Sequence, residues 1–235
     1  MFWRRHGWWP LCAFLTAFAI LELLGLDRPL AHTLYFDADS RQWLGAGNGS
    51  WWARDILHSG GRWLVRLVAA AALFLWTGSL LFKRLRNLRR GAGFVALAML
   101  LSTAIVGGLK ATSNVDCPWD LIEFGGDQPY VALFADRADE LPRAKCFPGA
   151  HASSGFALLC FYFLWRDRSR KLAAWGLAVG LAIGLAFAIG QEARGAHFLS
   201  HNLTSAAIVW YVQLALYAWL LKPPSSAMAE PVAAG

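Results

Sequence analysis

The sequence GQEARGAHFLSHNLT, residues Gly190–Thr204, joins two apolar segments in the second half of the chain. His197 and His201 are four residues apart, so on a helix they would lie on one face, with Arg194 one turn earlier. Ionisable groups at the edge of a hydrophobic span are costly and are functional candidates by default. The alternative is that these side chains extend to the polar surface of the membrane and have no catalytic or binding role. The rest of the chain favours a functional site.

The composition indicates a membrane protein. Of the 235 residues, 57% are hydrophobic and only 16% are charged, which is too apolar for an ordinary soluble domain. Several apolar runs approach the length needed to cross a bilayer. Many of the 13 tryptophans stand at segment ends, as in the aromatic belt of a membrane interface.

The net charge of +7 sets the predicted topology. Five of the eight residues Lys83–Arg90 are basic, and Arg166–Lys171 forms a second basic cluster. Both clusters join apolar spans, which is the positive-inside pattern of cytoplasmic loops. The basic residues form no soluble patch, so we expect no nucleic-acid partner.

We predict an all-α, polytopic membrane protein: a bundle of six transmembrane helices with both termini cytoplasmic and an external loop that carries part of the site. The first apolar run follows Arg4 and Arg5 and has no clear cleavage site, which favours a retained helix over a signal peptide. The domain covers residues 1–222, and residues 223–235 read as a disordered cytoplasmic tail. The six expected spans are residues 8–26, 62–82, 91–109, 149–165, 172–189 and 201–221.

Two polar segments are expected outside the membrane. Asp27–Gly61 reads as an external loop with a short interfacial helix. Thr112–Pro148 carries seven acidic and three basic residues and is long enough to be functional or disordered. Cys117 and Cys146 bracket this loop, and an oxidising external compartment would permit a disulfide between them.

The predicted topology brings five cationic or imidazole side chains to one external surface. Lysine and arginine bind phosphate oxygens through charge-assisted hydrogen bonds. One histidine can attack phosphorus while another protonates the leaving oxygen. With no Walker-type loop and no clear carboxylate metal site, the set indicates phosphoryl transfer without a metal or other cofactor. Its members are Lys110, His151, Arg194, His197 and His201.

Three ordered motifs resemble the membrane-bound type-2 phosphatidic acid phosphatase superfamily, whose pattern is K-x6-R-P, P-S-G-H and S-R-x5-H-x3-D. Lys110 with Cys117-Pro118, then Pro148–His151, then Arg194–His201 match it in order and approximate spacing. The resemblance implies a six-helix bundle that removes phosphate from lipid phosphates through a phosphohistidine. By position, His197 would be the nucleophile, His151 the general acid and Lys110 the phosphate clamp.

Four of the departures from the family pattern bear on the chemistry of the site. Cys117 and Gln191 replace its arginines, Gly149 replaces its serine, and His201 replaces the aspartate that orients the nucleophile. Gly149 would offer a backbone N–H at a helix N-terminus, and His201 could accept the orienting hydrogen bond. The missing arginine charge could come from three residues: Arg194, Arg143 and Lys145.

We therefore expect a lipid phosphatase of the bacterial inner membrane with its site facing the periplasm. Candidate substrates are undecaprenyl diphosphate, phosphatidylglycerol phosphate, phosphatidate and a lipid A phosphate. A lipid-to-lipid phosphotransferase and a non-catalytic lipid-phosphate binder or transporter remain open alternatives. A further alternative is a zinc site on His151, His197 and His201, which the neighbouring Lys110 and Arg194 disfavour by repulsion.

Overall fold

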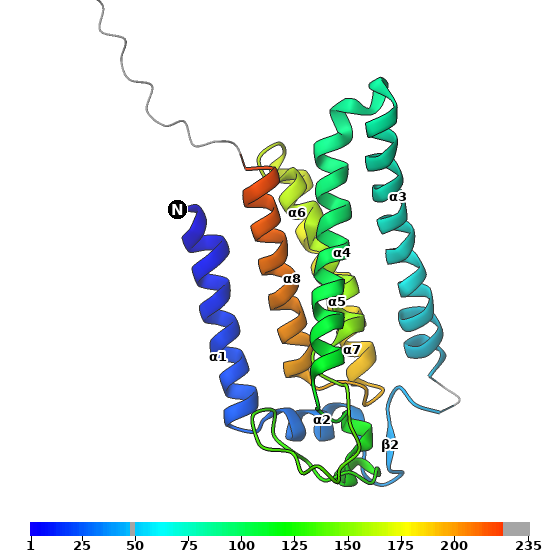
Figure 1. Cartoon of the computed structure of the whole chain (residues 1–235). Helices are drawn as coiled ribbons and strands as arrows, with labels where there is room; N and C mark the ends of the chain where they lie inside the picture. The colour runs from blue at the N-terminus through cyan, green and yellow to red at the C-terminus, as the bar shows by residue number, and fades with distance from the viewer. Residues whose placement is uncertain (48–49, 223–235) are drawn as a thin grey trace, which may run out of the picture.

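The structure, a computed structural model, describes residues 1–47 and 50–222, and it is a bundle of long helices (Figure 1). Five helical segments among these residues are long and apolar enough to cross a membrane. They are Arg4–Leu23, Trp52–Leu81, Lys83–Thr112, Arg170–Glu192 and Leu199–Leu220. Their main helices are α1 (Trp9–Leu23), α3 (Gly61–Leu81), α4 (Arg89–Thr112), α7 (Arg170–Glu192) and α8 (Leu199–Leu220).

The segment expected to be the fourth span is shorter than these five. It comprises α5 (Ala150–Phe156), the 3-10 turn η6 (Ala157–Leu159) and α6 (Cys160–Trp165). At 16 residues it falls below the length of an ordinary transmembrane helix. A count of six spans therefore stays a prediction, and the predicted tail, residues 223–235, lies outside the described residues.

Glycines on α7 allow this short segment to pack closely against it. A Cβ at Gly176 would lie 2.6 Å from the Phe161 carbonyl carbon, and a Cβ at Gly180 would lie 2.7 Å from the Leu159 nitrogen. Both distances are too short for a real side chain, so only glycine permits this approach. The close packing predicted from the glycine spacing is confirmed, and it fixes α5 beside α7.

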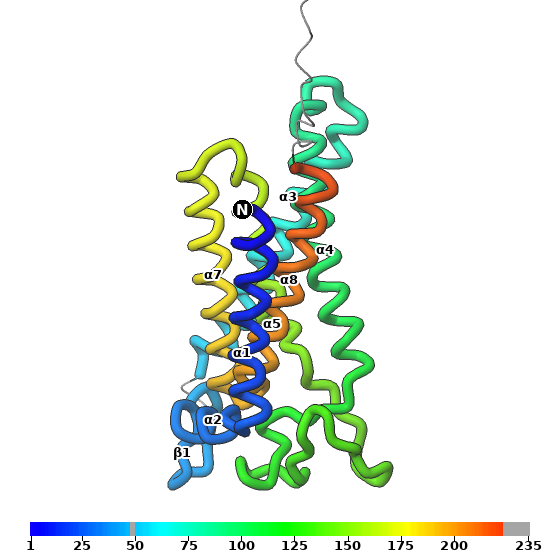
Figure 2. Tube along the Cα trace, turned by 90° about the vertical axis from the view of Figure 1, so that its left-hand side faces the viewer, coloured from blue at the N-terminus to red at the C-terminus, as the bar shows by residue number. Residues whose placement is uncertain are grey.

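Both ends of the described chain lie at one end of the bundle, and the loops that surround the candidate residues lie at the other (Figures 1 and 2). The basic segment η3 (Lys83–Leu88) lies at the same end as the N-terminus. α1 packs along α8 at the edge of the bundle (Figure 2). We call the end that carries residues 24–47, 50–60 and 113–149 the loop end.

At the loop end, an aromatic cluster covers the turn between α7 and α8. The expected interfacial helix is α2 (Asp27–Tyr35), and it leads into a hairpin of β1 (Phe36–Asp37) and β2 (Gln42–Trp43). These short strands depart from the all-α prediction. Phe36 pairs with Trp43 across the hairpin, and both pack on Phe124 of the long loop. Aromatic burial therefore holds together three segments that are distant in sequence.

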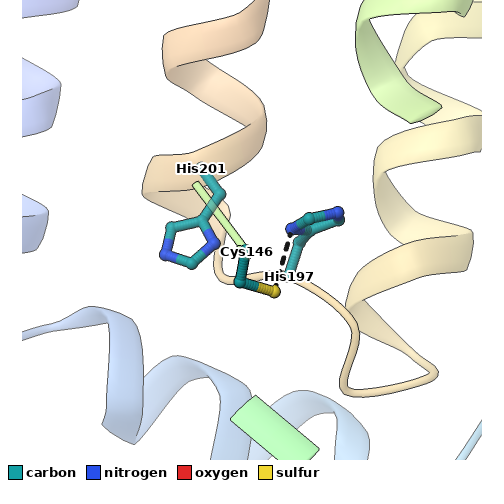
Figure 3. Close-up of side chains that lie close together, drawn as sticks. All are labelled: Cys146, His197 and His201. Atoms are coloured by element: carbon teal, nitrogen blue, oxygen red, sulfur yellow. Dashed lines mark hydrogen bonds between the residues drawn. The ribbon is translucent and has the colours of Figure 1, made fainter. Parts of the chain in front are cut away.

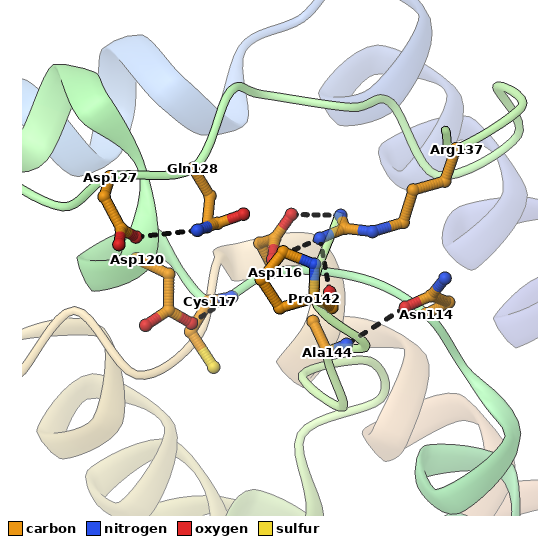
Figure 4. A network of polar contacts seen from close by, with 9 residues as sticks. All are labelled: Asn114, Asp116, Cys117, Asp120, Asp127, Gln128, Arg137, Pro142 and Ala144. Atoms are coloured by element: carbon orange, nitrogen blue, oxygen red, sulfur yellow. Dashed lines mark hydrogen bonds and ion pairs between the residues drawn. The ribbon is translucent and has the colours of Figure 1, made fainter. Parts of the chain in front are cut away.

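The long loop, residues 113–149, is held by polar contacts between its own residues (Figure 4). Arg137 and Asp116 form a buried ion pair, and Arg137 also donates to the carbonyl of Pro142 at 2.9 Å. Asn114 accepts from the backbone of Ala144 at 3.0 Å. These contacts join the start of the loop to its end, so both ends lie over the helix ends that carry the candidate site.

Candidate active site

The turn between α7 and α8 places His197 at the loop end. The chain is not one continuous helix here, because Gly195 adopts a positive φ of 70° and α7 ends at Glu192. Arg194 and His197 therefore do not share a helical face, as they would on a helix. α8 restarts with the Ser200 N–H donating at 3.1 Å to Asp27 of α2. Burial raises the pKa of this Asp27 carboxyl to about 6.

His197 is buried, with Nδ1 lying 3.6 Å from the sulfur of Cys146 (Figure 3). Cys146 is paired with Cys117 across a Cα–Cα distance of 5.1 Å. A disulfide sulfur carries no proton, so it can only act as a weak acceptor for an Nδ1–H. Burial, assisted by His201 and the charge of Lys110, holds the pKa of His197 well below its usual range. The ring is therefore neutral at neutral pH, and an Nδ1–H that faces the sulfur leaves Nε2 unprotonated.

His201 lies behind His197 on the first turn of α8 (Figure 3). The two ring centroids are 5.7 Å apart, and among the described residues no hydrogen bond joins the rings. The His201 ring packs edge-on against Phe147 and Phe198, and its Nδ1 has no partner in the described part of the chain. The orienting hydrogen bond expected from the sequence is thus not formed in this arrangement.

The donor atoms of Cys146, His197 and His201 lie within 4.8 Å of one another. A catalytic zinc site needs three protein ligands, and a cysteine ligates zinc as a thiolate. Cys146 paired in a disulfide offers no thiolate, which leaves two imidazoles. His151 lies outside this group of three, so the structure does not assemble the zinc site considered above.

Gly149 does not present its N–H to a ligand. The group donates at 3.1 Å to the carbonyl oxygen of His201, which ties the start of α5 to α8. A side chain at position 149 would collide with the amide oxygen of Asn202. The phosphate-binding role considered for Gly149 is therefore wrong, because its donor is already used.

His151 borders the site from α5. Its Nε2 donates at 3.2 Å to the carbonyl of Leu57, and its ring stacks on Phe187 with centroids 4.5 Å apart. The ring of His58 lies equally close on another side, at 4.5 Å. Phe187 also contacts Gly61, where a Cβ would collide with the ring. The absence of a side chain at Gly61 thus lets the start of α3 close over His151.

His151, His197 and Lys110 line one cavity of about 470 Å³ between α3, α4, α5 and α7. Its other polar lining comes from six residues, of which Arg62 and Arg66 lie on α3 and His58 on the segment that leads into α3. None of the described residues that line it is an Asp or Glu. The other three of the six are Thr103, Ser154 and Gln191.

Lys110 is half-buried at the end of α4 and forms no ion pair with any described residue. An unpaired ammonium group in a partly apolar cavity favours an anionic ligand. The three residues expected to replace the missing arginines do not line this cavity. Arg194 is half-buried beside Gly45, while Arg143 and Lys145 are exposed on the long loop.

A second cavity, of about 270 Å³, lies on the opposite side of His197 between α2, α7 and α8. Its lining includes the carboxyl groups of Asp27 and Glu192 and no lysine or arginine. Glu192 accepts from the Asn202 amide at 2.8 Å. We call the first space the front cavity and this second space the back cavity.

Comparison with protein families agrees with this geometry. The family model of the PAP2 superfamily matches residues 91–224, which include Lys110, His151 and His197. No curated protein and no solved structure matches the chain. Because the matched region covers more than half of the sequence and contains the nucleophile candidate, the chain belongs to the PAP2 superfamily.

Proposed function

We propose that this protein is an integral-membrane lipid phosphatase that uses His197 as its nucleophile and requires no metal. The observation that carries the proposal is the front cavity, in which Lys110, His151 and His197 meet without any carboxylate. The family match supports a phosphatase-type activity. The apolar part of the lining, which includes Val65, Ala69 and Met99, suits a lipid chain.

The first chemical step transfers the phosphoryl group to the protein. Nε2 of His197 attacks phosphorus, and the bond between phosphorus and the lipid oxygen breaks. His151, protonated when the anionic phosphate is bound, gives a proton from Nδ1 to that oxygen, because its Nε2–H is held by the Leu57 carbonyl. The lipid leaves as an alcohol or, from a diphosphate, as a lipid monophosphate. Lys110 stabilises the charge on the phosphoryl oxygens during the transfer.

The second step returns the protein to its starting state. Water attacks the phosphorus of the phosphohistidine while His151 accepts the water proton, and the nitrogen–phosphorus bond breaks to release inorganic phosphate. During both steps the Nδ1–H of His197 faces the Cys146 sulfur, which supplies little negative charge. The His197 imidazole is therefore nucleophilic because it is uncharged before the phosphoryl group is transferred.

The basic segments at the opposite end of the bundle support a cytoplasmic position for that end. On this orientation the front cavity faces the periplasm of a bacterial inner membrane. Undecaprenyl diphosphate, phosphatidylglycerol phosphate, phosphatidate and lipid A phosphates all present a phosphate at that depth with an apolar chain beneath it.

The direct test is phosphate release by purified protein over a panel of these lipid phosphates in the presence of EDTA, with His197→Ala as the control. We expect release that survives chelation and stops with vanadate, which mimics five-coordinate phosphorus. Loss of activity in EDTA that a divalent metal restores would reject the proposal. Transfer of labelled phosphate to a second lipid without release would identify a phosphotransferase, and tight binding without turnover would identify a non-catalytic binder.

A further inference from the structure

Three basic side chains descend one wall of the front cavity in steps of four residues. His58 lies in η2 (Trp52–Gly60), and Arg62 and Arg66 follow on α3. All three line the cavity that His197 and Lys110 also line. Neither arginine forms an ion pair with any residue that the structure describes. Together with Lys110 they bring three permanent positive charges to the cavity, and its lining supplies no negative charge.

Arg62 is tied to the candidate site, whereas an arginine near a helix end ordinarily extends toward the membrane surface. Its guanidinium donates at 3.3 Å to Nε2 of His58. The other nitrogen of that ring lies 3.1 Å from the amide of Gln191. Gln191 stands where the resembled motif has an arginine. Arg62 is thus held on the α3 side of the His58 ring, and that ring separates it from Gln191.

The cavity lining changes character with depth along α3. One helical turn separates Arg62 from Arg66, a descent of about 6 Å toward the middle of the bundle. Beside Arg66 the lining becomes apolar, through Val65, Ala69 and Met99. Along α3 the wall therefore offers two arginines and then a hydrophobic surface, and His197 and Lys110 line the same cavity.

A lipid diphosphate carries the groups that such a lining suits: a terminal phosphate, a chain-side phosphate and an apolar chain. We propose that Arg62 and Arg66, with His58 holding Arg62 in place, form a second phosphate subsite that selects lipid diphosphates over lipid monophosphates. This inference rests on the proposed function, since it assigns the terminal phosphate to His197. Arginine suits the role because its guanidinium binds phosphate oxygens in a bidentate manner.

The subsite also assists the reaction. When His197 attacks the terminal phosphorus, the bond to the bridging oxygen breaks and the leaving group is a lipid monophosphate. The negative charge on that leaving phosphate grows as the bond breaks, and the proton from His151 together with the two guanidinium groups neutralises it. A lipid monophosphate substrate has no group at this position, so its hydrolysis does not use Arg62 or Arg66.

The test compares farnesyl diphosphate with farnesyl monophosphate, which share one chain. We expect kcat/KM for the diphosphate to exceed that for the monophosphate by at least ~10-fold in the wild type. Arg62→Gln should lower the diphosphate value by about 10- to 100-fold and the monophosphate value by less than about 3-fold, the range for lost hydrogen bonds to a charged group. Arg62→Lys should restore part of the loss.

Arg54→Gln is the matched control, because Arg54 is exposed at the same end of the bundle, pairs with Asp55 and does not line the cavity. Equal losses on both substrates in Arg62→Gln, or a wild type that prefers the monophosphate, would overturn the inference. Thermal melting of each variant separates a folding defect from a binding defect, and Arg66→Gln provides a second variant for the same comparison.

Calorimetric binding of inorganic pyrophosphate and inorganic phosphate separates this inference from the proposed function. We expect the wild type and His197→Ala to bind pyrophosphate more tightly than phosphate, and Arg62→Gln to lose that difference. If neither farnesyl substrate is hydrolysed but the pyrophosphate preference depends on Arg62, the proposed function fails and the subsite stands. If monophosphates are hydrolysed and pyrophosphate shows no preference, the subsite fails and the proposed function stands.

Discussion

The front and back cavities of His197 have opposite electrostatic character. The front cavity is lined by Lys110, Arg62 and Arg66 and by no carboxylate, whereas the back cavity is lined by Asp27 and Glu192 and by no lysine or arginine. The imidazole of His197 thus lies between a basic and an acidic space. A phosphate ester is attracted to the first and repelled by the second.

The two cavities also differ in whether their charges are already satisfied. Asp27 accepts the Ser200 N–H at the start of α8, and Glu192 accepts the Asn202 amide, so both acids have partners within the protein. Lys110 has no acidic partner among the described residues. The comparison shows that the back carboxylates position the catalytic turn, while the front cations are left for a ligand.

The largest expected effect comes from substituting His197, which lines both cavities. His197→Ala should lower phosphate release by at least ~1000-fold, as the loss of a covalent nucleophile does. His201→Ala should cost only about 10- to 100-fold, because His201 supports the turn that carries His197 by packing against Phe147 and Phe198 and makes no hydrogen bond to the His197 ring. We expect His201→Asp to preserve or raise activity, since it adds the missing negative charge. Steady-state phosphate release checks all three variants, and normal turnover in His197→Ala would overturn the assignment.

Removing the charge of Lys110 tests the front cavity directly. Lys110→Met should lower kcat/KM by about 100-fold, the cost of losing one preorganised donor to the transferring group. The control is Lys171→Met, an exposed lysine at the opposite end of the bundle, which should change activity by less than about 2-fold if the effect is local. Similar losses in both variants would mean that Lys110 acts through general charge and does not clamp the phosphate.

The pairing of Cys117 with Cys146 can be tested through stability. The bond would close a loop with a sequence separation of 29, so its loss should lower the free energy of unfolding by about 3–4 kcal/mol in the chain-entropy model. The double variant Cys117→Ser, Cys146→Ser should melt at a lower temperature, while the exposed Cys12→Ser should not. Mass spectrometry of unreduced protein that finds both thiols free would contradict the pairing.

The smallest expected effect concerns pH and the back cavity. The pKa of Asp27 is raised to about 6 by burial, so the folded state binds a proton that the unfolded chain has already lost. The stability contributed by Asp27 is therefore fully present below about pH 4 and is lost as pH rises to about 6. Asp27→Asn keeps an acceptor for Ser200 and should remove this pH dependence, which melting curves between pH 4 and pH 8 would measure.

Asp37→Asn is the matched control of opposite sign. Asp37 is exposed, and the hydroxyl of Ser40 holds the pKa of its carboxyl below the usual range. Its contribution to stability is present at neutral pH and is lost as pH falls, so the variant should be less stable than the wild type at neutral pH and should approach it at the acidic end. If both variants shifted the melting curve in the same direction, the interpretation of Asp27 would be wrong.

Apolar periodicity and the basic clusters were sufficient to predict the long helices and to bring Lys110, His151 and His197 to one end. These signals depend on the membrane, which constrains span length and loop charge strongly. The break at Gly195 and the use of the Gly149 N–H could not be predicted, because each depends on contacts with a segment distant in sequence. The use of the Gly149 N–H depends on the carbonyl of His201, which accepts it. The amide oxygen of Asn202 leaves no room for a side chain at position 149.

The cavity-lining role of the basic residues on α3 could not be predicted from the sequence. The spacing of His58, Arg62 and Arg66 was visible, but the same spacing fits side chains that extend to the membrane surface. Only the contact of Phe187 with Gly61, which brings the start of α3 over His151, turns this face toward the cavity. That contact leaves no periodic pattern in the sequence.

Two different parts of the chain supply the wall of the front cavity formed by α3 and the residue proposed to attack phosphorus. The region that matches the family begins at residue 91 and contains His197, the proposed nucleophile, whereas His58, Arg62 and Arg66 precede it. Changes in the preceding helix can therefore alter which head group fits without disturbing the groups that break the bond. Such an architecture lets one reaction be retained through evolution while its substrate is exchanged.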